Sequence, residues 1–151
     1  MNNTKGILVF KLLLLLCFSA FSQQKTNLSY SLSFENEIAV KSNGNEAQIK
    51  KYYQEKNLYC LHFGSGFSFQ KTCVFVNDSL VFEGVLTTNE SVELAGKGLT
   101  FNKKKGCHLR VEFDKLGNLE FCPSKDYTFI LIDKKEKGFK IKQSNNCLNR
   151  K

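Results

Sequence analysis

Cysteine and histidine are the residue types in this chain best suited to bind a metal ion, and several lie close together in the sequence. Cys60 and His62 are two positions apart, which puts both side chains on one face of a β-strand. Cys107 and His108 are adjacent, and Cys122 follows nearby. Thiolate and imidazole together favour zinc or copper. Because neither a C-x-x-C nor an H-x-x-x-H unit is present, we assign no metal ligand, and a metal-handling envelope protein stays an alternative.

The same cysteines are candidates for structural disulfides. If the strand that carries Cys60 pairs with the strand that carries Cys73, the two side chains face each other and can be bridged. Cys107 and Cys122 flank a second hairpin, although they are directly opposed only if a bulge intervenes. Cys147 lies in a polar tail, where it either pairs with a strand cysteine or stays free. An exported chain meets an oxidising compartment, so we predict at least one of the first two bridges.

No catalytic constellation can be named in this sequence. Residues 64–66 read Gly-Ser-Gly, but Phe63 and Phe67 stand where a G-x-S-x-G nucleophile elbow around Ser65 needs its two glycines. The glycines do not continue into a phosphate-binding G-x-G-x-x-G motif either, because Phe69 occupies the last position. We therefore nominate no catalytic residue and no cofactor, and a small secreted hydrolase or inhibitor is kept only as a further alternative.

The first 22 residues have the features of a secretory signal peptide. Lys5 and Lys11 give a basic start, and residues 12–18 form a short apolar core. Ala20 and Ser22 place small residues before a cut that would make Gln23 the new N-terminus. The apolar run is shorter than the roughly 18 residues of a membrane span. We therefore predict a secreted or periplasmic protein with no transmembrane segment after signal removal.

The mature chain, residues 23–151, is expected to be one basic domain. Loss of Lys5 and Lys11 reduces the 22 basic residues to 20, and with 14 acidic residues the formal charge is +6. This excess favours anionic surfaces such as an acidic glycan. Nucleic acid is excluded as a partner because export removes it from reach. Leu16 before Cys17 matches the lipid-anchor pattern poorly.

Alternating apolar and polar residues predict β-strands along most of the domain. Residues 28–34 alternate Leu, Tyr, Leu and Phe with serine, which is the pattern of a half-buried strand. Ile38 and Val40 extend it after a break. Residues 46–56 contain good helix formers but only a weak apolar stripe, so a short helix and irregular structure both stay open there.

Turn signals join these strands into hairpins. Asn77 and Asp78 tolerate positive φ and predict a two-residue loop between strands 73–76 and 80–86. The implied register puts four residues on the core face: Cys73, Phe75, Leu80 and Phe82. Further turns lie at residues 114–118 and 133–138. About eight short strands predict an all-β domain, a small antiparallel β-sandwich of Ig-like or jelly-roll-like type.

We expect this domain to be a binding or interaction module of the cell envelope or extracellular space, with an unknown protein or an anionic glycan as partner. Such scaffolds usually bind through loops, so the loops at residues 64–69 and 102–106 are the candidates. Lys140 and Lys142 share one face of the last predicted strand. We interpret them as protection of a sheet edge against pairing with another chain.

Overall fold

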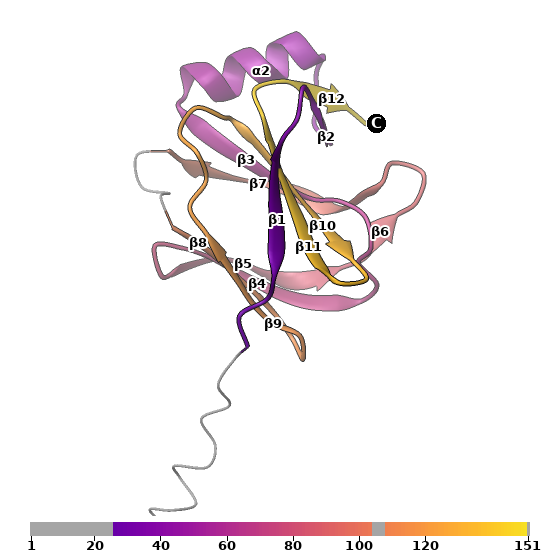
Figure 1. Cartoon of the computed structure of the whole chain (residues 1–151). Helices are drawn as coiled ribbons and strands as arrows, with labels where there is room; N and C mark the ends of the chain where they lie inside the picture. Colours follow the sequence, from indigo (N-terminus) through magenta and orange to yellow (C-terminus); the bar gives the residue numbers. More distant parts are fainter. Residues whose placement is uncertain (1–25, 104–107, 151) are drawn as a thin grey trace, which may run out of the picture.

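The computed structural model describes residues 26–103 and 108–150, which form three β-sheets and one helix (Figure 1). The elements in chain order are β1 (Tyr30–Phe34), β2 (Ile38–Val40), α2 (Glu46–Glu55), β3 (Leu58–Phe63), β4 (Gln70–Val76), β5 (Ser79–Leu86), β6 (Thr88–Asn89), β7 (Leu94–Asn102), β8 (Leu109–Phe113), β9 (Gly117–Phe121), β10 (Phe129–Lys135), β11 (Gly138–Ser144) and β12 (Cys147–Asn149). The larger sheet has the order β1-β11-β10-β3-β7-β6, the smaller has the order β5-β4-β8-β9, and β2 pairs with β12.

The predicted all-β, sandwich-like fold is confirmed, but the sheets are not purely antiparallel. The four-stranded sheet is antiparallel throughout. In contrast, β1 pairs with β11, β3 with β10, and β2 with β12 in parallel. These parallel pairs join strands that are far apart in the chain, and therefore no local turn signal announces them.

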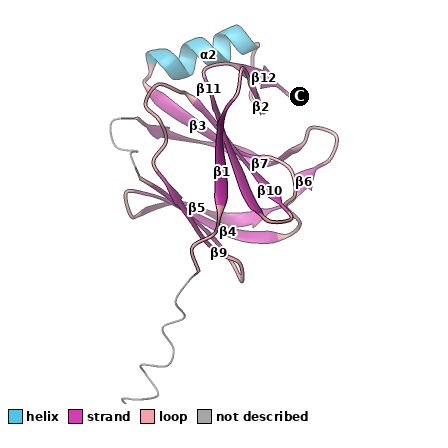
Figure 2. Cartoon of the chain, viewed as in Figure 1, coloured by secondary structure: helices cyan, strands magenta, loops and turns pink. Residues whose placement is uncertain are grey.

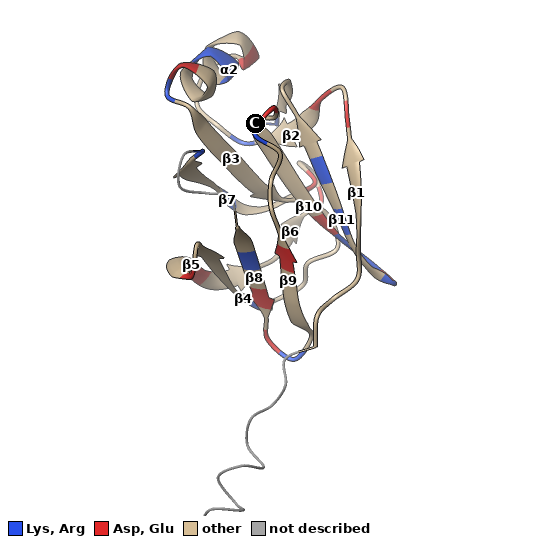
Figure 3. Cartoon of the chain, turned by 60° about the vertical axis from the view of Figure 1, so that its left-hand side comes forward, with Lys and Arg blue, Asp and Glu red and all other residues tan. Residues whose placement is uncertain are grey.

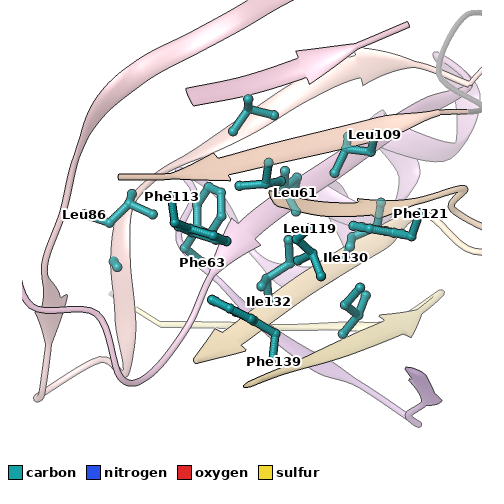
Figure 4. Close-up of a cluster of buried hydrophobic side chains, with 14 of the residues drawn as sticks. Leu61, Phe63, Leu86, Leu109, Phe113, Leu119, Phe121, Ile130, Ile132 and Phe139 are labelled. Carbon is teal, nitrogen blue, oxygen red and sulfur yellow. The ribbon is translucent and has the colours of Figure 1, made fainter. Parts of the chain in front are cut away.

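The two larger sheets pack face to face around the main core. Figure 4 shows part of this core, with side chains from β3, β5, β8, β9, β10 and β11 pointing toward one another. Phe113 of β8 stacks on Phe139 of β11 with ring centroids 4.6 Å apart. Phe67 packs against both rings and against Phe63. The loop that carries Phe67 is therefore anchored in the core rather than free in solvent.

The other face of the six-stranded sheet is covered by α2 and the β2–β12 pair (Figure 2). This second core gathers residues from the sheet, the helix and the short strands: Ile38, Val40, Ile49, Cys60, Val92, Leu94, Phe129, Leu131 and Cys147. Side chains alternate along β3, so Tyr59 and Leu61 enter the main core while Cys60 faces the second one. The fold thus has three layers.

Of residues 46–56, Glu46–Glu55 form a helix rather than irregular structure. The Asn45 side chain accepts a hydrogen bond from the Gln48 backbone, and the Gln48 side chain accepts one from the Asn45 backbone. This reciprocal capping box satisfies two donors at the start of the helix. Ile49 is buried in the second core and compensates for the weak apolar stripe.

The hairpin loop at Asn77 and Asp78 is confirmed, with φ angles of 46° and 62°. The first two residue pairs after the turn also match the prediction. A bulge then shifts the register, so that Val74 pairs with Phe82 instead of Val81.

The predicted core face of this hairpin is wrong for β4. Val74 and Val76 are buried in the main core, together with Thr72. Phe82 packs against that core as expected. Three residues assigned to the core face lie outside it: Cys73, Phe75 and Leu80. Apolar residues occupy both faces of the hairpin, so their alternation could not identify the buried one.

Lys140 and Lys142 do not protect a sheet edge, because β11 lies between β1 and β10. Lys142 Nζ is 2.6 Å from an oxygen of the buried Asp133, and Lys140 Nζ is 3.1 Å from Glu35. The lysines therefore neutralise acids on the outer face of the sheet. β1 is one of the two edge strands of this sheet. The predicted half-burial of β1 is wrong, because the large side chains at residues 30, 32 and 34 are 43%, 47% and 56% exposed.

Candidate interaction edge and a buried cysteine–histidine pair

β5 forms a free edge of the four-stranded sheet (Figure 3). In the described part of the chain it pairs with β4 alone. It is eight residues long, and it carries one charged residue, Glu83, with no lysine or proline. Charges and prolines are what natural edge strands commonly use to prevent pairing. β5 therefore offers its backbone N–H and C=O groups with little protection beyond one bulge.

Large apolar side chains line this edge. The exposed fractions are 52% for Leu80, 48% for Val81 and 54% for Val85. Phe69 precedes β4 and is 81% exposed, the largest value for a bulky apolar residue in the described ranges. Gln70 pairs with Leu86, which places Phe69 beside the end of β5. Several exposed apolar residues gathered at one edge are typical of an interaction site.

Phe69 is held in an unusual backbone conformation. Its φ of 47° lies in the left-handed region, which bulky residues rarely adopt. The Thr87 side chain accepts a hydrogen bond from the Phe69 N–H at 3.1 Å, and that of Thr88 accepts one from the Phe67 N–H at 3.0 Å. A strained residue that its neighbours hold in place is often a functional one. The predicted loop at residues 64–69 thus presents Phe69 and buries Phe67.

A hollow of about 700 Å³ opens beside β5. Lys71, Glu83, Val85 and Asp114 contribute to its lining. Cys73 also lies there, directly opposite Glu83 in the β4–β5 register. The hollow is large enough to receive side chains from a segment that lies along β5.

Cys60 and His62 lie together, as their spacing predicts. Cys60 Sγ is 3.3 Å from His62 Nε2, and both residues are buried between the six-stranded sheet and its cover. Burial raises the pKa of Cys60 to about 12 and lowers the pKa of His62 to about 4. Both groups are consequently neutral at pH 7, so Cys60 is not an activated nucleophile.

The other predicted cysteines do not join this pair. β3 pairs with β7 and β10 rather than with β4, so the strand pairing assumed for a Cys60–Cys73 bridge is wrong. Cys122 is exposed at the end of β9 in the other sheet. Cys107 lies outside the described residues, so a Cys107–Cys122 bridge stays a prediction. Cys60 and Cys147 have free thiols.

Cys60 and His62 make only two potential metal ligands. Within residues 26–103 and 108–150, no group of three or more His, Cys, Asp or Glu side chains is placed to hold a metal ion. No helix in these same ranges is long and apolar enough to cross a membrane. The arrangement suits hydrogen bonding inside a neutral pair better than metal coordination.

Comparisons of the chain with protein-family models, curated proteins and solved structures found no match. Function must therefore be argued from the surfaces of the molecule itself. Sequence reasoning missed the β5 edge, because the position of a strand within its sheet depends on distant pairings. The one local signal was the presence of apolar residues on both faces of residues 80–86.

Proposed function

We propose that the protein is an exported interaction module that binds an extended segment of a partner protein along β5. The observation that carries this proposal is the free edge itself, with Leu80, Val81 and Val85 about half exposed. In strand addition, backbone hydrogen bonds supply affinity and alternating side chains supply specificity. Export rests on the signal-peptide features of residues 1–22.

β5 is a better candidate than β1, the other edge strand with exposed apolar residues. Tyr30 lies 6.1 Å from the Phe121 ring, and Phe34 stacks on Tyr127 at 4.8 Å. These intramolecular contacts use part of the apolar surface of β1. β1 also has five residues against eight in β5, so it can pair with a shorter segment.

The chemistry of the edge favours an apolar partner strand with a basic residue opposite Glu83. Glu83 is the one charge on β5, and an oppositely charged cross-strand neighbour would be stabilising. An anionic glycan suits this edge poorly, because the same carboxylate would repel it.

Site-specific photo-crosslinking tests the proposal. A photoreactive residue replaces Val85 in one version of the mature protein and Lys51, which is 73% exposed on α2, in another. With envelope and secreted proteins of the source cells, we expect a discrete adduct from position 85 and none from position 51. The further change Val81→Lys should reduce that adduct at least about tenfold, because it places a charge in the apolar interface.

Two outcomes would overturn the proposal. The first is the same set of adducts from positions 85 and 51, or no adduct at all. The second is an adduct of twice the mass of the chain, which would identify a second copy rather than a partner.

A further inference from the structure

A second pocket lies on the outer face of the six-stranded sheet, where the β3–β7 ladder is interrupted. Leu61 pairs with Leu99, but the next paired residue, Phe63, lies opposite Ala95. Residues 96–98 of β7 therefore bulge opposite the single residue His62. Bulges open a ladder locally and re-aim side chains, and they are common next to binding sites. The result here is a pocket of about 760 Å³ with His62 in its wall.

Gly98 lets the backbone of β7 pack directly on the His62 imidazole. A Cβ at this position would lie 2.5 Å from His62 Cε1 and 2.5 Å from Nε2, closer than any side chain tolerates. The His62 residue is 2% exposed, yet its ring still lines the pocket. The imidazole is thus a buried polar group, held firmly at the inner end of an open pocket.

The rest of the lining is cationic or neutral. Lys41, Ser42, Asn43 and Gly44 come from the loop before α2, Tyr53 from α2, and Lys97 and Gly98 from the bulge. The described lining contains no acidic residue, and no ion pair joins Lys41 or Lys97 to a carboxylate in the described ranges. Two ammonium groups without counter-charges create a positive potential in a concave site.

Cys60 Sγ lies 3.3 Å from His62 Nε2, and this contact between two buried groups fixes the orientation of the ring. A neutral imidazole can donate a hydrogen bond from one nitrogen while it accepts one at the other.

We infer that this pocket binds a small organic anion, such as an acidic sugar, with its oxyanion group held by Lys41 and Lys97 beside the His62 imidazole. The volume lies in the range of about 300–1,000 Å³ that is typical of small-molecule sites, which favours an organic ligand over a bare ion. The inference is independent of the β5 edge, since the two sites lie on different sheets.

Calorimetric titration of the mature protein with glucuronate, glucose 6-phosphate, glucose and inorganic phosphate tests this inference. We expect saturable binding of the two sugar anions, and binding of glucose and inorganic phosphate that is at least about tenfold weaker. The double variant Lys41→Ala/Lys97→Ala should lose at least about tenfold in affinity for the anions. The matched control Lys51→Ala/Lys137→Ala removes the same charge from exposed positions outside the pocket and should bind normally.

Nitrogen-15 NMR of the His62 ring locates the bound anion. We expect the ring signals to shift in a saturable way on addition of glucuronate and to stay unchanged on addition of glucose. Equal binding of glucose and glucuronate, equal losses in both double variants, or His62 signals that do not respond to glucuronate would overturn the inference, as would phosphate binding as tightly as the sugar anions.

Discussion

The buried imidazole of His62 should make the stability of the fold depend on pH. Burial lowers the His62 pKa from 6.5 to about 4, so between these values the unfolded chain binds a proton that the folded chain rejects. The free energy of unfolding therefore keeps its full value above about pH 6.5 with respect to His62. It decreases as the pH falls from 6.5 toward 4. A difference of this size corresponds to about 3 kcal/mol in the free energy of unfolding.

Urea unfolding at pH 7.5 and pH 4.5 measures this effect. When the pH is lowered from 7.5 to 4.5, the free energy of unfolding should fall less in His62→Gln than in the wild-type protein. The difference between the two decreases should be up to about 3 kcal/mol. His108→Gln is the matched control, because that side chain is 38% exposed and its removal takes away an imidazole without opening the core. Identical pH profiles for the wild type and His62→Gln would contradict the prediction.

At the scale of elements, the bulge in β7 depends on one glycine. Gly98→Ala forces a methyl group against the His62 ring, and overpacking of a buried site costs about 1–3 kcal/mol. We expect this loss in the free energy of unfolding, measured in urea. In a His62→Ala background the ring is absent, so the same substitution should cost at least about 1 kcal/mol less. Equal costs in both backgrounds would show that the ring and the bulge are not coupled.

Local patterns identified the strands whose side chains alternate without interruption, but they could not supply the neighbours of those strands. β7 was missed because Gly96 and Gly98 break its alternation. β12 was missed because it is short, lies in a polar tail and pairs with β2 at the other end of the chain. The proximity of Cys60 and His62 was predictable, since two residues of one strand need no partner to share a face. Their contact with Gly98 depends on the β3–β7 pairing and was not predictable.

For the molecule as a whole, mass spectrometry of the protein isolated from its source cells tests both the predicted signal peptide and the thiols. We expect a chain that begins at Gln23, in which Cys60 and Cys147 are alkylated in denaturant without prior reduction. Cys60 faces the second core on the far side of the six-stranded sheet, whereas Cys73 lies on β4 of the other sheet, so a bridge between them requires a different fold. The same spectrum compared with that of the reduced protein decides the Cys107–Cys122 bridge. Retention of residues 1–22, or a Cys60–Cys73 bridge, would contradict the prediction.

The parallel pairings of β1 with β11 and of β2 with β12 affect the order in which the protein can fold. The first strands of the chain have no partner until the last ones are present, so neither the central sheet nor its cover can close early. Folds dominated by such distant pairings also form slowly. A newly made chain with this connectivity cannot complete its six-stranded sheet or the cover of that sheet until its C-terminal strands have been synthesised, so the finished fold arises only after the last strands have left the ribosome.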